Sequence, residues 1–288
     1  MQTLTGNAYA KINLTLNVTG VRDDGYHELE TVMHTVSLCD RIVVRRSQQT
    51  GVTLGCNLPY VPRDGRNLAV KAAEAFFAAA GIEGEGLEIH MKKNIPVGAG
   101  MAGGSTDAAA VLRLLNKMYG NPLPDRRLSE LALSLGADVP FCMRGGAALA
   151  RGVGERLRPA PCLPDCWLVI CKPPVSVSTK RAYALLDQCP RLTHPQSAPM
   201  LDALGQKDLR AVCNALGNSF QAPIEAERPI IGEARRALME NGAMGALMSG
   251  SGSSVFGVFR CEKHARKAAG TLKRRYRETF VARPVAHI

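Results

Sequence analysis

The residue types best suited to chemistry lie in a glycine-rich run, Pro96 to Ala110, which leads directly into the apolar helix pattern of Val111 to Met118. Glycines tolerate positive φ angles and let a ligand approach the backbone. Ser105, Thr106 and Asp107 either cap a helix or sit well in its first turn. Unpaired amides at a helix start, together with the helix dipole, favour an anion. The run therefore predicts a phosphate-binding loop.

Three of these glycines, Gly98, Gly100 and Gly103, also fit the G-x-G-x-x-G pattern of dinucleotide-binding folds and protein kinases. A Rossmann loop follows a buried apolar strand, whereas residues 87–96 form an alternating, half-polar strand pattern that ends in proline. The H-R-D and D-F-G sequences of protein kinases and the G-x-x-x-x-G-K-[ST] sequence of P-loops do not occur. The remaining alternative is a structural turn, which needs neither this length nor the Ser-Thr-Asp sequence that follows.

The composition describes a globular protein with enough apolar residues for a core. The chain has 288 residues, 46% of them hydrophobic and 21% charged. Prolines cluster between Pro159 and Pro164, which predicts two domains, at residues 1–160 and 161–288. No apolar run approaches the length of a membrane helix, and the N-terminus lacks a secretion signal pattern, so we expect a cytoplasmic protein.

The nine cysteines are odd in number and scattered through predicted core segments, which indicates reduced thiols. Cys162, Cys166 and Cys171 are close in sequence, but they lack the C-x-x-C spacing and neighbouring histidines of a zinc site. We therefore expect no metal held by protein side chains alone.

The formal net charge of +11 is compatible with nucleic acid, anionic lipid or an anionic small substrate as a partner. Much of it lies near the C-terminus, on Arg260, Lys263, Arg266, Lys267, Lys273, Arg274, Arg275 and Arg277. A solvated helix face accounts for such a pattern, and RNA binding is the alternative. Because no RNA-binding motif is recognisable, we expect no nucleic acid as a partner. Because no apolar run has the length of a membrane helix, we expect no membrane as a partner.

The periodicity of apolar residues predicts a mixed α+β protein without regular βαβ alternation. Strands are predicted at residues 11–18, 31–38, 40–46, 87–95, 167–171, 246–248, 255–259 and 280–285. Helices are predicted at residues 67–80, 111–118, 124–135, 209–216 and 229–241, after a cap at Ser178, and in the basic segment near the C-terminus. Residues 51–65 are predicted to form a loop rich in Pro and Gly.

With these residues in view, the chain resembles the superfamily of galactokinase, homoserine kinase, mevalonate kinase and phosphomevalonate kinase (GHMP). The P-x-x-x-G-L-G-S-S-A-A motif of the superfamily is matched by Pro96 to Ala109, with Met101 in place of Leu and Gly103-Gly104 inserted before the hydroxyl residues. Its third motif is matched by the glycine-serine loop from Ser249 to Ser254.

Within the superfamily, the chain is most similar to the 4-diphosphocytidyl-2-C-methyl-D-erythritol kinase family of the non-mevalonate isoprenoid pathway. The segments Ala10 to Leu14, Gly20 to His27 and Leu135 to Pro140 match signatures of that family in the right order. The resemblance implies an α+β fold with a ribosomal-protein-like N-terminal domain, a ferredoxin-like C-terminal domain and an active site between them. It also implies an ATP-dependent kinase that phosphorylates the 2-hydroxyl of 4-(cytidine 5′-diphospho)-2-C-methyl-D-erythritol.

The resemblance further implies a role for Asp138 as the catalytic base, paired with Lys11, whose charge keeps the carboxylate ionised. On sequence alone, an acid between apolar neighbours is more often a turn cap or a satisfied buried group. The implied ATP-binding residues are Asn67, Leu68, Pro96, Val97, Gly98, Ala99, Gly100, Met101, Ala102, Gly103, Gly104, Ser105 and Thr106. No dedicated acidic ligand for Mg²⁺ is recognisable, so we expect the ion to be held mainly by nucleotide oxygens and water. For Asp107 two roles are open: it adds negative charge beside the phosphates, or it is favoured by the first turn of the helix.

On sequence alone, Tyr26 and His27 are ordinary loop aromatics. The family comparison implies instead that both belong to the substrate site, that His27 stacks on cytosine with Tyr183 on the opposite face, and that Asn13 helps to place the diol. The expected partners are small molecules, ATP and a cytidine diphosphate sugar alcohol, bound by a monomer or a weak homodimer. Another kinase of the superfamily, such as mevalonate or homoserine kinase, is the nearest alternative, and Tyr26-His27 argues against it.

Overall fold

The computed structural model describes residues 2–23 and 25–288, so Asp24 of the Gly20 to His27 motif lies outside the described residues. The chain divides into two compact units. Unit 1 consists of Met1–Ala10, Cys39–Val97 and Ala102–Arg144; unit 2 consists of Lys11–Leu38, Gly98–Met101 and Gly145–Ile288. The sequence division at residue 160 stays a prediction.

Two long strands, β1 (Thr3–Val21) and β2 (His27–Ser47), contribute a segment to each unit. The other elements of unit 1 are β3 (Gly51–Cys56), α1 (Leu68–Ala80), β4 (Gly86–Lys92), α2 (Gly103–Met118), α3 (Asp125–Leu135) and α4 (Val139–Arg144). The other elements of unit 2 are β5 (Ala147–Gly152), β6 (Arg156–Pro159), β7 (Trp167–Lys172), α5 (Thr179–Asp187), α6 (Ser197–Gly205), α7 (Leu209–Asn214), β8 (Gly217–Asn218), α8 (Gln221–Glu227), α9 (Pro229–Glu240), β9 (Gly245–Met248), β10 (Val255–Phe259), α10 (Glu262–Lys273) and β11 (Glu278–Ala282).

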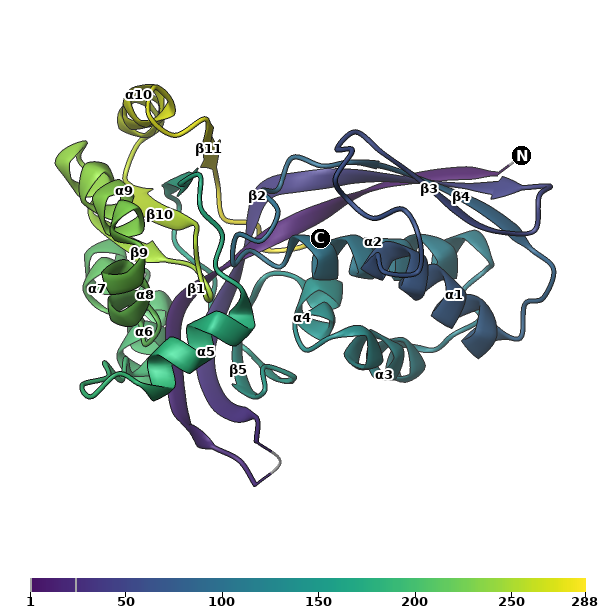
Figure 1. The fold of residues 1–288 in the computed structure, drawn as a ribbon, viewed down its shortest axis with the longest axis horizontal. Helices are drawn as coiled ribbons and strands as arrows, with labels where there is room; N and C mark the ends of the chain where they lie inside the picture. The colour runs from purple at the N-terminus through teal and green to yellow at the C-terminus, as the bar shows by residue number, and fades with distance from the viewer. Residues whose placement is uncertain (1, 24) are drawn as a thin grey trace. The chain divides into compact units, whose positions relative to one another are not determined.

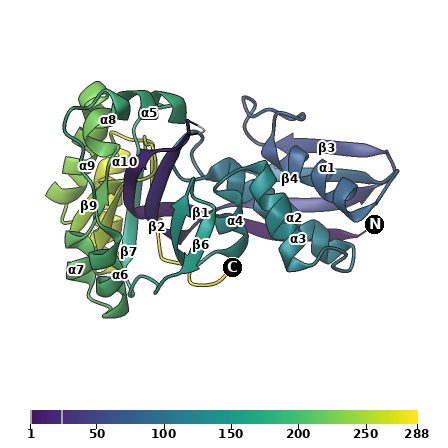
Figure 2. The same ribbon diagram turned by 90° about the horizontal axis from the view of Figure 1, so that it is seen from below.

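A seven-stranded sheet has the order β3-β4-β2-β1-β8, and β5 pairs with both β2 and β6. In unit 1, β2 runs antiparallel to β4, from the pair Arg41 and Lys92 to the pair Ser47 and Gly86. Side chains alternate along this part of β2, with Ile42 and Val44 buried. Helices α1, α2 and α3 lie along one face of these strands (Figures 1 and 2), which explains the alternation.

Helix α1 shows why the local sequence folds as predicted. Asn67 is its N-cap, and the side-chain oxygen accepts a hydrogen bond from Ala69 N at 2.9 Å. Gly81 ends the helix in the left-handed region, with φ 64°. The stripe between them, which includes Ala69, Ala73 and Phe76, is buried against the sheet side of unit 1. The prediction of a helix at residues 67–80 is confirmed.

Two predictions about strands are wrong. The predicted strands 31–38 and 40–46 form the single strand β2, which continues through Asp40. The break predicted at residue 39 does not occur, and the fully buried Asp40 carboxyl accepts hydrogen bonds from the amides of Asn94 and Ile95. The predicted loop 51–65 begins with β3, because its backbone pairs in parallel with β4.

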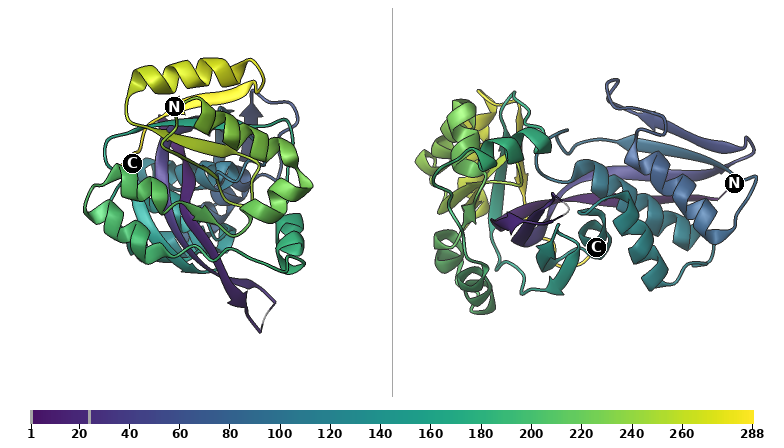
Figure 3. Two further views of the ribbon diagram at one scale, coloured as in Figure 1. Left: turned by 90° about the vertical axis from the view of Figure 1, so that its left-hand side faces the viewer. Right: turned by 60° about the horizontal axis from the view of Figure 1, so that its bottom comes forward.

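In unit 2, a four-stranded antiparallel sheet has the order β11-β7-β10-β9. The hairpin β9–β10 was predicted from the sequence and is confirmed. Helices α9 and α10 lie side by side over this sheet (Figure 3), and Leu238, Ala268 and Leu272 join Val169 in its core. A sheet of this order with two helical crossovers is the expected ferredoxin-like arrangement.

Helix α10 carries half of the C-terminal basic residues, namely Lys263, Arg266, Lys267 and Lys273. Its alanines, Ala265, Ala268 and Ala269, and Leu272 are buried, so the charged residues occupy the opposite face. Arg266 pairs with Glu262 one turn earlier. This is the solvated helix face expected as the simpler explanation of the pattern. Among the described residues, no helix combines the length and apolar character needed to cross a membrane.

Candidate active site

The glycine-rich run and the glycine-serine loop, far apart in sequence, lie in contact in unit 2. Ser249 Oγ donates a hydrogen bond to Gly100 O at 3.0 Å, and Ser254 N donates one to Ala99 O at 3.3 Å. Gly100 has φ 71°, and a Cβ there would lie 2.1 Å from Ser249 O. A Cβ on Gly250 would lie 2.8 Å from Gly100 O. Both loops therefore need glycine where their backbones meet.

Asn218 stabilises the glycine-serine loop, a role that was not predicted from the sequence. Its Nδ2 donates hydrogen bonds to Met248 O and Gly250 O, both at 2.8 Å, and its Oδ1 accepts one from Phe220 N at 2.9 Å. The side chain is 4% exposed. A single asparagine after a glycine carries no spacing signal, so only the fold shows this role.

Helix α2 begins at Gly103, after Ala102 in the left-handed region with φ 57°. No side chain caps it, so Ser105, Thr106 and Asp107 lie within its first turns. The Thr106 hydroxyl is buried and donates to Tyr9 O at 2.6 Å, whereas Ser105 is half-buried. Of the two hydroxyls, that of Ser105 is the better placed to reach a ligand.

Of the two roles open to Asp107, the structure disfavours a charge beside the phosphates. Its carboxyl points into unit 1 and pairs with Lys93, at 2.6 Å between Oδ2 and Nζ. Burial raises the pKa of Asp107 to about 8; attraction to Lys93 opposes this effect, and repulsion from Asp40 adds to it. The carboxyl is therefore directed to Lys93 and not toward a ligand at the glycine loop.

The start of α1 lies close to the start of α2 in unit 1. A Cβ on Gly104 would lie 3.5 Å from Leu68 Cδ1. The amide of Asn67 is already engaged, since Nδ2 donates to Pro62 O at 2.8 Å while Oδ1 caps α1. A nucleotide base at this point would meet the Leu68 side chain and the second N–H of the Asn67 amide.

Lys11 and Asn13 are neighbours on one face of β1 in unit 2, as the strand alternation predicts. Lys11 Nζ donates to Asn13 Oδ1 at 2.8 Å, and Asn13 Nδ2 donates to Thr31 Oγ1 at 2.8 Å. Thr31 Oγ1 in turn donates to Thr15 O at 2.5 Å. This chain of hydrogen bonds fixes a buried ammonium group, because Lys11 is only 5% exposed.

Asp138 lies in unit 1, in the link between α3 and α4. It immediately precedes α4, and its carbonyl accepts a hydrogen bond from Cys142 N at 3.1 Å. The residue is half-buried. Lys11 belongs to the other unit, and the pairing of these two side chains stays a prediction.

His27 and Tyr183 lie face to face in unit 2. Their ring centroids are 4.3 Å apart with an interplanar angle of 26°, and Phe220 packs edge-on against Tyr183 at 5.0 Å. His27 Nε2 lies 2.7 Å from Asp187 Oδ1. Tyr26 is 65% exposed. The rings leave no space for a base between them, so stacking on both faces of a base requires them to separate.

Asp187 is a second residue that the sequence analysis missed. It lies four positions after Tyr183 on α5, so both side chains are on one side of the helix. That spacing was visible in the sequence, but nothing there indicated that His27 would meet it.

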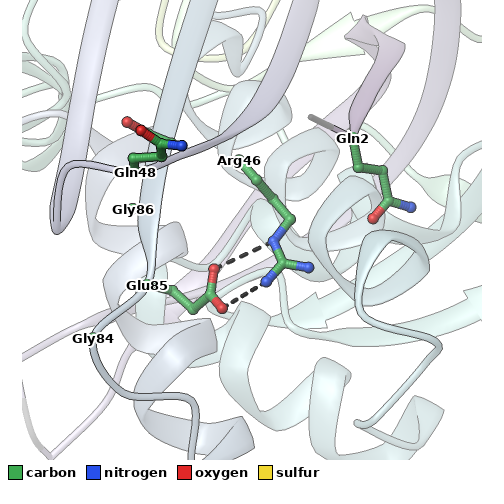
Figure 4. Close-up of a pocket in the computed structure, with 7 residues that line it drawn as sticks. Gln2, Arg46, Gln48, Gly84, Glu85 and Gly86 are labelled. Atoms are coloured by element: carbon green, nitrogen blue, oxygen red, sulfur yellow. Dashed lines mark hydrogen bonds and ion pairs between the residues drawn. The ribbon is translucent and has the colours of Figure 1, made fainter.

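A surface hollow of about 390 Å³ in unit 1 is lined by Gln2, Arg46, Ser47, Gln48, Gly84, Glu85 and Gly86 (Figure 4). The polar side chains of this hollow bond to their neighbours: Arg46 pairs with Glu85 at 2.6 Å, and the Tyr119 hydroxyl donates a hydrogen bond to Glu85 at 3.1 Å. Gly86 begins β4, whereas the glycine loop follows the other end of that strand, about 20 Å away. The hollow contains none of the predicted site residues.

Comparison with known proteins adds independent support for the fold. Residues 67–146 match the model of the GHMP kinases N terminal domain, and residues 200–278 match that of the GHMP kinases C terminal domain. The first range contains Asn67, the glycine-rich run and Asp138. The second contains Asn218 and the glycine-serine loop.

Full-length relatives narrow the assignment. The chain is 41% identical over 278 residues to the 4-diphosphocytidyl-2-C-methyl-D-erythritol kinase of Clostridium botulinum, a match that covers 96% of this chain and 99% of the relative. The chain belongs to the 4-diphosphocytidyl-2-C-methyl-D-erythritol kinase family. Lys11, Asn13, His27 and Tyr183 lie outside the two domain models, so only similarity across the whole chain connects them to this family.

Solved structures agree with membership of the 4-diphosphocytidyl-2-C-methyl-D-erythritol kinase family. A crystal structure of 4-(cytidine 5′-diphospho)-2C-methyl-D-erythritol kinase matches with a TM-score of 0.83 and 38% identity, covering 98% of this chain and 99% of the other. The homoserine kinase of Cytophaga hutchinsonii matches with a TM-score of 0.75 at 20% identity, covering 100% and 96%. At 20% identity, the similarity to the homoserine kinase supports the fold alone.

Proposed function

We propose that this chain transfers the γ-phosphoryl group of ATP to the 2-hydroxyl of 4-(cytidine 5′-diphospho)-2-C-methyl-D-erythritol, in the non-mevalonate route to isoprenoid precursors. The observation that carries the proposal is 41% identity, over nearly the whole of both chains, to a kinase of that name. The paired glycine loops and the uncapped start of α2 supply a phosphate site that suits this chemistry.

ATP binds through backbone amides in this proposal. The residues from Pro96 to Thr106 hold the phosphates, because their glycines expose amides and α2 directs the positive end of its dipole toward an anion. Asn67 and Leu68 contact adenine at the start of α1, where Leu68 supplies an apolar surface beside Gly104. The two ends of the nucleotide then meet the starts of neighbouring helices.

Mg²⁺ accompanies ATP in the proposed reaction and offsets phosphate charge. Among the described residues, no group of three or more His, Cys, Asp and Glu side chains is placed to hold a metal ion. The half-buried Ser105 is the hydroxyl at the start of α2 that fits such an ion. The rest of its coordination comes from nucleotide oxygens and water.

The chemical step moves one proton and one phosphoryl group. The acceptor oxygen bonds to the γ-phosphorus, the bond from that phosphorus to the bridging oxygen breaks, and ADP leaves. Asp138 accepts the proton of the acceptor hydroxyl. Lys11, fixed through Asn13, places a positive charge that stabilises the developing alkoxide.

The acceptor is recognised through its cytidine group and its diol. We assign the base to the site around Tyr26, His27 and Tyr183, with Asp187 orienting the imidazole. Asn13 lies next to Lys11 and contacts the diol. Opening of the ring stack accompanies binding of the base, since the two rings are in direct contact without it.

The test is ATP consumption by the purified chain in the presence of Mg²⁺. Four acceptors are compared: cytidine diphosphate methylerythritol, mevalonate, homoserine and galactose. We expect turnover only with the first. Turnover with only one of the other alcohols would agree with a kinase of this fold but would contradict the assignment of a cytidine site. Absence of turnover with all four would overturn the proposal.

A further inference from the structure

Three charged side chains form a cluster in the interior of unit 1. Asp40, Lys93 and Asp107 are 0%, 7% and 3% exposed. Lys93 Nζ lies between the two carboxyls, bonded to Asp40 Oδ2 and, at 2.6 Å, to Asp107 Oδ2. The proposed phosphoryl transfer uses none of these three side chains. They come from β2, from the residue after β4 and from the first turns of α2.

The cluster bonds to the chain on both sides of the glycine loop. Before the loop, Asp40 Oδ1 accepts hydrogen bonds from the amides of Asn94 at 2.5 Å and Ile95 at 2.8 Å. After the loop, Lys93 Nζ donates to Gly103 O at 3.4 Å and to Asp107. Residues 96–102 are thus anchored at each end by one connected network.

A side chain at Gly103 would crowd its neighbours at this anchor. A Cβ there would lie 3.3 Å from Ile95 Cγ2 and 3.4 Å from Lys93 Nζ. The absence of a side chain lets the start of α2 approach the segment before the loop. Glycine at position 103 therefore favours the close contact between the start of α2 and Lys93.

Stability alone does not explain the cluster. Taking three charges out of water costs free energy that mutual attraction repays only with good geometry, and apolar residues of similar size often stabilise as well or better. Here the pairing is incomplete, because the buried Asp107 Oδ1 has no hydrogen-bond partner. Burial lowers the pKa of Lys93, but its two carboxyl neighbours outweigh this and raise it.

We propose that Asp40, Lys93 and Asp107 are positioning residues that hold the two ends of the glycine loop at the spacing its amides need to bind phosphate. The inference rests on the proposed function, because it assigns the loop to ATP. These residues act through the backbone of the loop and do not touch the nucleotide. Loss of the network is expected to weaken nucleotide binding while the acceptor site is unaffected.

The experiment compares Lys93→Met and Asp107→Asn with wild type and with Asn116→Ala. Asn116 is a matched control because it is buried on the same helix and bonds to Leu123, about 20 Å along α2 from Gly103. The measurements are ADP affinity by titration calorimetry, KM for ATP, KM for the acceptor and the thermal midpoint. All are made at a temperature where circular dichroism shows each variant to be folded.

We expect Lys93→Met to weaken ADP binding and raise KM for ATP roughly tenfold or more, since displaced binding groups lose affinity steeply. KM for the acceptor should stay within about twofold, as expected for a local effect on the loop. Asp107→Asn keeps the side-chain volume and should shift the same two quantities in the same direction by less. Asn116→Ala should lower the thermal midpoint and leave ADP affinity unchanged.

ADP affinity equal to wild type in both folded cluster variants would overturn the inference, as would equal losses of ATP and acceptor affinity. If Lys93→Met does not fold, Asp107→Asn alone decides between these outcomes. The wild type separates this inference from the proposed function. No ADP binding by wild type would overturn both, whereas tight binding by wild type and variants alike would remove only the positioning role.

Discussion

His34 offers a direct test of the electrostatics of unit 2. It is fully buried on β2, its Nδ1 donates to Thr35 O at 2.8 Å, and its Nε2 accepts a hydrogen bond from Leu163 N at 3.0 Å. Both nitrogens are thereby satisfied in the neutral form. Burial lowers the pKa of His34 from 6.5 to about 4, although the bond to Thr35 acts in the opposite direction.

The sign of the effect follows from proton binding. Between pH 4 and 6.5 the unfolded chain holds more protons at His34 than the folded chain does, so acidification favours unfolding. A fall in pKa from 6.5 to about 4 corresponds to about 3 kcal/mol of unfolding free energy, at about 1.4 kcal/mol per pKa unit. This stability is present above pH 6.5 and is lost as the pH falls toward 4.

The assay is urea unfolding of wild type and His34→Gln across that range. A glutamine amide can donate to Thr35 O and accept from Leu163 N, but it does not titrate. We expect wild type to lose about 3 kcal/mol more than the variant between neutral pH and pH 4. Carboxyl groups contribute equally to both proteins and cancel in the comparison. Parallel curves for the two proteins would refute the reasoning.

The remaining predictions concern activity. Asp138→Asn should lower kcat by roughly a hundredfold to ten-thousandfold without loss of ATP binding, and near wild-type turnover would remove Asp138 as the base. Asp187→Ala frees the His27 ring and should raise KM for the cytidine acceptor roughly three- to tenfold while KM for ATP stays constant; a change in both would contradict the orienting role. Gly100→Ala forces a Cβ into the second glycine loop and should reduce ATP affinity at least about tenfold, whereas Gly270→Ala, on α10 with open space around it, should not. Equal behaviour of the two alanine variants would show that the contact between the loops is unimportant.

Local sequence signals predicted the elements whose boundaries depend on nearby residues. The Asn67 cap and Gly81 stop define α1, and the Ser178 side chain caps α5 through Arg181 N. The hairpin β9–β10 and its loop followed from an apolar alternation around glycine and serine. The short helices α6 and α8 were not predicted, because their stability depends on packing within unit 2 more than on a strong amphipathic pattern.

Interactions between distant segments could not be predicted in the same way. The burial of Asp40 could not be predicted because its partner, Lys93, lies 53 residues later in the sequence. Asn218 contacts the glycine-serine loop and Asp187 contacts the His27 ring, and no pattern in the sequence indicated either partner. The glycine loop itself was predicted as a phosphate site from residue types alone, while its contact with residues 249–254 is seen only in the fold.

The central claim is tested most directly by locating the phosphate on the product. The purified chain is incubated with ATP, Mg²⁺ and cytidine diphosphate methylerythritol, and the new monoester is examined by proton-coupled ³¹P NMR. The 2-hydroxyl is on a tertiary carbon, so the account predicts a singlet, because no proton lies three bonds from phosphorus. A triplet from a primary ester, a doublet from a secondary ester, or no new monoester would contradict it.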